Sequence, residues 1–216
     1  MKKILMLVVM ATIMVQANAQ IVSSRSSMVT RHVMTKKTKS YNGWKTLGIE
    51  YISGRFSDDL YYIRNGNSFI GGAVNYTQAI SITRSAPLFL ELGFGGQFSY
   101  AESDGALKYV SVKIPVNLIY DIQIPNTNVC LAPYVGLNFR GNVWGYFSGY
   151  NIFSDGIPDY EYRYDKWTRF QIAAQAGVKA RFNNKFFIGI GYGLDFNEIV
   201  ENTKVNELSI SAGIVF

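Results

Sequence analysis

Nine charged residues stand at alternating positions inside otherwise apolar segments of this chain. In these segments they share a face with Gly, Ser, Asn and other small or polar residues, whereas the opposite face carries Leu, Ile, Val and aromatic residues. Unpaired charges in a narrow, closed space cost roughly several kcal/mol each, so we expect the acids and bases to pair with one another. The candidates for such a charge network are Glu50, Glu91, Lys113, Arg140, Arg169, Lys179, Arg181, Asp195 and Glu207.

The order of these residues along the chain predicts how they pair. Three acids belong to the first, seventh and eighth alternating segments and three bases to the fourth, fifth and sixth; they are Glu50, Asp195, Glu207, Lys113, Arg140 and Arg169. If the segments close into a ring, acids on one wall face bases on the other. Such a network satisfies internal charge whatever the protein does, and the alternative interpretation is a narrow ion path or gate.

The usual catalytic base is absent from these segments. The only histidine is His32, which lies before the first alternating segment, and histidine is the most common general base near neutral pH. The glycine-rich runs 93–96 and 189–193 lie inside alternating segments, so they are not phosphate-binding loops. No spacing typical of metal ligands occurs. We therefore expect no enzyme activity, no metal and no cofactor.

The alternation itself predicts β-strands, because side chains of period two point to opposite faces of a strand. Segments of about 9–11 residues separated by turns are typical of β-barrels that cross membranes. We expect eight strands, at about 43–54, 67–83, 87–101, 107–121, 128–140, 166–182, 185–198 and 207–216.

Three residues stand out against this pattern. Gln78 falls on the apolar face of the second segment. Pro115 cannot donate a ladder hydrogen bond, so we expect a bulge or another irregularity in the fourth strand. Cys130 is the only cysteine, which excludes an intramolecular disulfide, and we interpret it as a small buried side chain.

Alternation alone does not separate a membrane barrel from a soluble β-sandwich or a lipocalin-like barrel, in which the apolar face points inward. The glycine-rich face of segments such as 189–193 would make a poor solvated surface but suits a crowded barrel interior. Aromatic residues near strand ends are typical of interfacial girdles, and here they are Tyr51, Tyr76, Tyr100, Tyr120 and Phe216. We therefore predict an all-β fold: an eight-stranded antiparallel up-and-down transmembrane β-barrel over residues 43–216.

The first residues predict export from the cytoplasm. Two lysines precede an apolar run over 4–15 and the sequence Ala17-Asn18-Ala19, which together indicate a cleaved signal peptide over 1–19. The alternative, a permanent anchor, is disfavoured because a spanning helix needs about 20 apolar residues. Residues 20–42 are basic and rich in Ser and Thr, so we expect a flexible periplasmic tail. Export argues against a nucleic-acid partner.

The connections between the predicted strands alternate in length. Short turns on the periplasmic side and longer extracellular loops are the rule in such barrels, and the longest connection here is 141–165. Exposed aromatic residues anchor interfaces, so we hypothesise that this loop is a recognition surface. The alternative is that it merely extends the two flanking strands and adds girdle aromatics. The candidate recognition residues are Trp144, Tyr146, Phe147, Tyr150, Phe153, Tyr160 and Tyr162.

Two internal segments and the terminal strand carry a family resemblance. VSVKIPVNLIYD (110–121), APYVGLNF (132–139) and ELSISAGIVF (207–216), which ends on Phe216, resemble segments of the small bacterial outer-membrane β-barrel proteins. That group is often called the porin family or the outer membrane protein beta-barrel domain. The plan is similar to that of the OmpX and OmpA barrels, and the two internal segments are most similar to Bacteroidetes-type members. The resemblance implies the bacterial outer membrane as location and no enzyme activity.

Together these observations lead us to expect a monomer in outer-membrane lipid with a side-chain-filled lumen, because eight strands leave an interior just wide enough for side chains. Its expected role is structural or surface interaction, by adhesion or binding through extracellular loops. Candidate partners are lipopolysaccharide and a host or cell-surface protein or glycan. The alternative is a narrow porin-like channel for ions or small solutes.

Overall fold

The computed structural model describes residues 42–57, 67–83, 86–102, 106–158 and 164–216 of the chain. The predicted signal peptide and almost all of the predicted tail lie outside the described residues. Within the described ranges, no helix is long and apolar enough to cross a membrane.

Long β-strands make up most of the described chain. Eight of them form the wall: β1 (Trp44–Phe56), β2 (Ser68–Ser81), β3 (Leu88–Ala101), β4 (Leu107–Tyr120), β6 (Val129–Phe147), β10 (Phe170–Phe182), β11 (Phe186–Asp195) and β12 (Val205–Val215). Short strands lie in the connections: β5 (Ile122–Gln123), β7 (Tyr150–Asn151), β8 (Ile157–Pro158) and β9 (Tyr164–Asp165).

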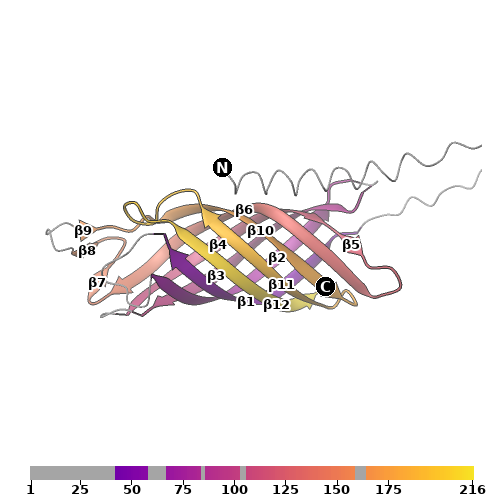
Figure 1. Cartoon of the computed structure of the whole chain (residues 1–216), viewed down its shortest axis with the longest axis horizontal. Coiled ribbons are helices and arrows are strands. Elements are labelled where there is room, and N and C mark those ends of the chain that lie inside the picture. The colour runs from indigo at the N-terminus through magenta and orange to yellow at the C-terminus, as the bar shows by residue number, and fades with distance from the viewer. Residues whose placement is uncertain (1–41, 58–66, 84–85, 103–105, 159–163) are drawn as a thin grey trace, which may run out of the picture. The chain divides into compact units, whose positions relative to one another are not determined.

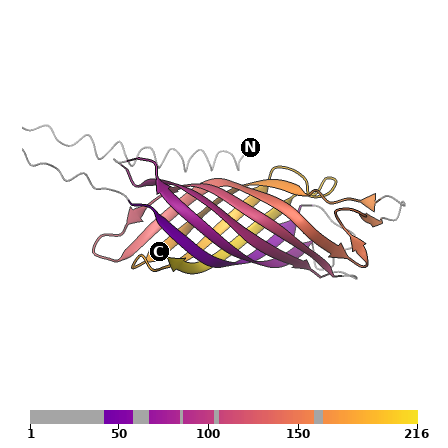
Figure 2. The same cartoon turned by 180° about the vertical axis from the view of Figure 1, so that it is seen from behind.

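The eight long strands close into an antiparallel barrel. The sheet runs from β10 through β11, β12, β1, β2, β3 and β4 to β6, and the pairing of β6 with β10 closes it. The terminal strand pairs with the first as predicted, with Leu47 opposite Ile214 and Ile49 opposite Ala212. Figures 1 and 2, which view the barrel from opposite sides, show the strands crossing it obliquely. The predicted eight-stranded up-and-down barrel is thus confirmed.

The register of the ladders sets the tilt of the strands. A row of paired residues that starts at Lys45 in β1 returns to β1 at Arg55, ten residues further along the strand. A stagger of this kind is what allows a tilted sheet to close. Each row therefore rises, from β1 through β2, β3, β4 and β6, toward the end of the barrel that holds Phe56. The row passes through Gln78, Leu92, Val116, Leu137, Ala174, Leu194 and Asn206.

We call this end, where β1, β3, β6 and β11 finish, the loop end, and the opposite one the turn end. The connections at the turn end are short, whereas those at the loop end include the segment from Ser148 to Arg169. This asymmetry is the usual one between periplasmic turns and extracellular loops.

The faces of the strands are inverted relative to a soluble protein. Large apolar side chains point outward, as in Ile49 (68% exposed) and Phe94 (63% exposed), whereas Gln97 and Ser111 are buried inside. The apolar face thus lies outside, which excludes the lipocalin-like and sandwich alternatives. Gln78 lies on the outer face, as expected, beside Lys45.

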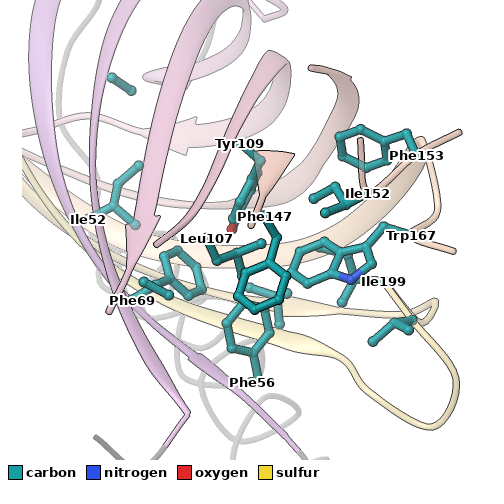
Figure 3. Close-up of a cluster of buried hydrophobic side chains, with 14 residues drawn as sticks. Ile52, Phe56, Phe69, Leu107, Tyr109, Phe147, Ile152, Phe153, Trp167 and Ile199 are labelled. Carbon is teal, nitrogen blue, oxygen red and sulfur yellow. The ribbon is translucent and has the colours of Figure 1, made fainter. Parts of the chain in front are cut away.

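Apolar side chains also close the interior at both ends. The loop-end cluster, drawn in Figure 3, brings Phe56, Phe69, Tyr109, Phe147 and Trp167 together with Ile52, Ala73, Ala101, Leu107, Ile152, Phe153, Ile199, Val200 and Val205. The turn-end cluster consists of Trp44, Ala79, Phe89, Ile119, Ala132, Phe187 and Val215. The polar part of the lumen lies between them.

The fourth strand departs from expectation in where its irregularity lies. The β4–β6 register shifts between Val110 and Ser111, where Val143 is the extra residue of a bulge, and not at Pro115. Pro115 keeps its register with Asn138 of β6, but no ladder pair joins it to β3. An antiparallel residue directs its N–H to one neighbour only, so the missing donor interrupts that single ladder without displacing the strand.

Candidate functional site

Two ion pairs cross the middle of the lumen. Lys113 of β4 lies 2.9 Å from a Glu50 carboxylate oxygen of β1, and Asn75 donates a second hydrogen bond, of 2.8 Å, to the same carboxylate. Lys179 of β10 lies 2.7 Å from Glu91 of β3. Glu50 and Lys113 are separated by two intervening strands, so their pairing spans the interior.

Glu91 shows how completely such a charge is satisfied. Its side chain is 0% exposed, and Thr77 and Asn117 each donate a hydrogen bond of 2.9 Å to it in addition to the two from Lys179. A buried carboxylate is tolerated when a cation and further donors occupy its lone pairs.

A third group of charges lies closer to the loop end and centres on Arg140 of β6. One guanidinium nitrogen donates to Asp195 of β11 and the other to Glu207 of β12. Gln97 donates a 2.9 Å hydrogen bond to Glu207, and Gln171 donates to Asp195. Arg140 is 1% exposed, so this two-acid, one-base group is withdrawn from solvent.

The fourth group of charges includes an acid that the sequence analysis missed. Arg181 of β10 lies 2.6 Å from Asp121, the residue directly after β4, and its guanidinium carbon lies 3.7 Å from the ring centre of Trp44. Asp121 is the last residue of the segment 107–121, and its odd position shares the inward parity of Lys113 and Asn117. That parity was the available signal.

Arg169 is the one predicted network residue that the structure places elsewhere, and that prediction is wrong. It precedes β10, its side chain is exposed, and its guanidinium lies 5.6 Å from the ring centre of Phe153. The strand begins at Phe170 and not at 166, so Arg169 lies at the mouth of the barrel and not within the lumen.

Amide and hydroxyl side chains that were not predicted as site residues complete the polar layer. Ser111 and Asn142 share a 2.6 Å hydrogen bond, and Asn142 donates to Gln171 at 2.9 Å. These side chains link the Asp195 carboxylate to the neighbouring strands. Only their inward position in the alternation could have identified them.

Two adjoining cavities remain between the ion pairs, of about 60 and 20 Å³. Both are lined by Glu50, Lys113, Tyr134, Asn138 and Gln175. The buried Asn138 Oδ1 accepts no hydrogen bond from the described residues. A water molecule needs about 10–15 Å³ by this measure. The larger cavity therefore has room for a few water molecules but is too small for solutes to pass through it.

The predicted recognition loop is partly a continuation of the wall. β6 runs on to Phe147, and the bulge at Val143 leaves two consecutive side chains, Val143 and Trp144, on the outer surface. Trp144, Tyr146 and Tyr150 are 45%, 43% and 39% exposed. The rings of Trp144 and Tyr146 stack with their centres 6.4 Å apart. We call these three residues the aromatic edge.

The other predicted recognition residues behave differently. Phe147 and Phe153 are buried in the loop-end cluster, so their assignment to an exposed recognition surface is wrong. The β6–β7 turn folds back and inserts these rings into the mouth, because apolar side chains there gain more from burial than from exposure. Tyr160 and Tyr162 lie outside the described residues.

In the part of the chain that the structure describes, no group of three or more His, Cys, Asp or Glu side chains is placed to bind a metal ion. Cys130 is buried and its thiol lies 2.7 Å from Gln123 Oε1, as a donor.

A closed barrel with an apolar outer wall and a filled, charged interior is the structure of an integral outer-membrane protein. The chain belongs to the outer membrane protein beta-barrel domain family, which matches residues 6–216. The protein accordingly resides in the bacterial outer membrane. Among curated proteins, no sequence matches this chain.

Several solved barrels are similar in fold alone. Ail of Yersinia pestis, determined in complex with the heparin analogue sucrose octasulfate, is 18% identical, with 81% of this chain and 99% of that chain covered and a TM-score of 0.47. Neisserial surface protein A is 14% identical, covering 79% and 95%, with a TM-score of 0.48. The outer membrane enzyme PagL is 10% identical, covering 77% and 98%, with a TM-score of 0.46.

Proposed function

We propose that this protein is a sealed, monomeric membrane anchor that displays a recognition surface at its loop end. The observation that carries the proposal is the aromatic edge. Trp144 and Tyr146 stay exposed where β6 extends beyond its pairing with β10, which begins only at Gly141, and Tyr150 stays exposed on β7, which pairs with the end of β6. Rings held rigidly on a strand lose little conformational entropy when a partner covers them.

The interior supports an anchor role. Apolar clusters close both ends of the lumen, and three groups of ion pairs occupy the space between them. The Arg181–Asp121 pair lies at the turn end, where Arg181 covers Trp44 of the turn-end cluster. Lys113, Lys179 and Arg181 each pair with one acid, and Arg140 is shared by Asp195 and Glu207. Such an arrangement stabilises a plugged barrel and offers a solute no continuous path.

Point substitutions on the aromatic edge test this proposal. Deleting 145–162 would remove Phe147 and Phe153 from the loop-end cluster, so Trp144→Ser, Tyr146→Ser and Tyr150→Ser together are the sharper variant. We expect binding of the protein to whole cells and extracellular matrix to fall by about tenfold or more. Heat-modifiable gel migration, which reports the folded barrel, should persist.

The matched control is Phe196→Ser, which removes a ring that is 58% exposed just after β11, outside the aromatic edge. This variant should bind like the parent protein. Equal binding by the triple variant and the parent would remove the recognition role.

The second candidate is a narrow channel, favoured by one observation. The two cavities adjoin and are lined by the charges Glu50 and Lys113, as a short ion path would be. Recording from the purified barrel in planar bilayers separates the two functions. The sealed anchor predicts no discrete conductance steps, and reproducible steps would favour the channel.

A catalytic role receives no support from the residues of the barrel. The only histidine of the chain is His32, outside the described residues, and the described carboxylates of the lumen are held in ion pairs rather than facing an open pocket. We therefore propose a non-enzymatic protein.

A further inference from the structure

The outer wall of the barrel carries an apolar groove of about 500 Å³. It crosses β1, β2, β3 and β4 on the lipid-facing side. The outward residues that line it are Ile49, Gly72, Val74, Gly96, Phe98 and Val110. We call this feature the wall groove.

Two glycines on neighbouring strands create the wall groove. A Cβ atom on Gly96 would meet nothing within 4 Å, and one on Gly72 would meet only the Glu50 carbonyl oxygen, at 3.8 Å. Neither position therefore requires glycine for packing against the protein. Their missing side chains leave bare backbone between the bulky neighbours Ile49, Val74 and Phe98.

The register gives the wall groove a direction. Gly72 pairs with Phe98, Phe98 with Val110, and Val110 with Trp144, along a row that rises toward the loop end. The wall groove thus climbs obliquely from Ile49 to Val110. A hydrocarbon chain lying in it would point its polar end toward the outer surface of the membrane.

A cation lies at the upper end of this path. Lys108 is exposed, two residues beyond Val110, and is paired with Tyr100 on β3 and Tyr146 on β6. An outward lysine between two phenol rings is placed to meet an anionic headgroup, because an ammonium group binds phosphate as a point charge.

We propose that the wall groove binds one acyl chain of a phosphorylated glycolipid of the outer leaflet, with its phosphate at Lys108. The charge complementarity at the top and the apolar lining below match the two parts of such a molecule. Tyr100 and Tyr146 then flank the sugar–phosphate region, where amphipathic rings are favoured at the membrane interface. This ligand is a component of the membrane itself, so the proposal goes beyond recognition of a partner by the aromatic edge.

Native mass spectrometry of the detergent-solubilised full-length barrel, titrated with diphosphoryl lipid A, tests the proposal. Gly96→Leu fills the wall groove, and Lys108→Gln removes the cation. Each substitution should weaken lipid A retention by about tenfold. Dephosphorylated lipid A should bind the parent protein and K108Q equally weakly, and phosphatidylglycerol should bind the parent more weakly than lipid A does.

Two controls are matched to these variants. Ala176→Leu places the same side chain on the outward face of β10, and Lys185→Gln removes an exposed lysine at the turn end. Both should retain lipid A like the parent protein, and heat-modifiable migration confirms folding of each variant. Parent-like retention by G96L and K108Q would overturn the proposal. So would equal losses in the controls, or phosphatidylglycerol binding as tightly as lipid A.

Discussion

Arg140 holds two carboxylates at once in a place almost free of solvent. Its 1% exposure and its bonds to Asp195 and Glu207 make it the sole cation within ion-pairing distance of these two acids among the described residues. Removing one member of a buried ion group is far more damaging than never having built the group, because the remaining charges lose their compensation.

At this residue we predict that Arg140→Leu lowers the free energy of unfolding by about 3–5 kcal/mol. The loss arises from two carboxylates left buried without a cation. Urea titration in lipid vesicles, followed by gel migration, measures it. Adding Asp195→Asn and Glu207→Gln to R140L should restore much of the stability. A loss no larger than that of Lys185→Leu, which removes an exposed cation, would contradict the prediction.

At the scale of the elements, β10 and β11 leave room on their inner faces for Tyr134 of the neighbouring strand β6, which lies opposite Gly177 of β10. A Cβ atom on Gly191 would lie 2.3 Å from the Tyr134 hydroxyl oxygen, and one on Gly177 would lie 2.5 Å from it. Gly191 is thus required by the close approach of Tyr134, whereas at Gly177 the Ile190 carbonyl oxygen of β11 also lies close, 2.3 Å from such a Cβ. A large inward side chain lies flat over its neighbouring strands in this way because an eight-stranded barrel has little interior width.

We therefore predict that Gly191→Ala costs about 1–3 kcal/mol of stability through overpacking. Gly193→Ala, on the same inward face, is the matched control, because its Cβ would meet no atom closer than 3.8 Å; it should be nearly neutral. Tyr134→Phe removes the clashing oxygen, so G191A should cost less in that background. Thermal unfolding of the parent, the three single variants and the G191A/Y134F double variant provides the comparison, and equal costs for G191A and G193A would disprove the steric account.

At the scale of the whole molecule, the lumen is closed by two seals in series. The loop-end cluster and the turn-end cluster are built from different residues and lie on either side of the ion pairs of Glu50, Glu91 and Arg140. Either seal alone interrupts a path of water. This arrangement explains why a polar interior need not make a channel.

Planar-bilayer recording of truncated seals extends the test of the anchor role. We predict that truncating one seal leaves the barrel silent, whereas truncating both produces discrete conductance. The loop-end substitutions are Phe56→Ala, Phe69→Ala and Trp167→Ala, and the turn-end substitutions are Trp44→Ala, Phe89→Ala and Phe187→Ala. Conductance with one seal intact would show that the seals do not act in series.

The fold could be predicted from the sequence because period-two alternation is a local signal repeated in every strand. Leu47, Ile49 and Tyr51 face outward for the same reason that Leu208, Ile210 and Ile214 do. Placing Phe147 and Phe153 could not be predicted in this way. Whether an aromatic ring near a strand end stays outside or folds into the mouth of the barrel depends on the path of the connecting loop. That path produces no periodic pattern in the sequence.

The candidate site was predictable to the same degree. The alternation of side chains identifies the residues that face the lumen. It does not identify their ion-pair partners, because the strand register determines which residues meet, and these can be as distant in sequence as Lys179 and Glu91. The error at Arg169 and the omission of Asp121 both concern strand ends, where parity stops being informative. The bulge residue Val143 is neither a proline nor a glycine, so its residue type does not predict a bulge.

The pairing of β1 with β12 has a consequence for assembly. Lys45 and Phe216 exchange two backbone hydrogen bonds across the seam, of 2.8 and 3.0 Å, and Thr46 lies opposite Val215. The first and last strands of the described chain must therefore meet before every strand has both of its neighbours. Until then, two rows of unpaired peptide groups would face hydrocarbon, where each costs several kcal/mol. Closure of the seam must therefore be tightly coupled to membrane insertion. A half-inserted intermediate would be a high-energy state whose unpaired edge strands could pair with an edge strand of another protein.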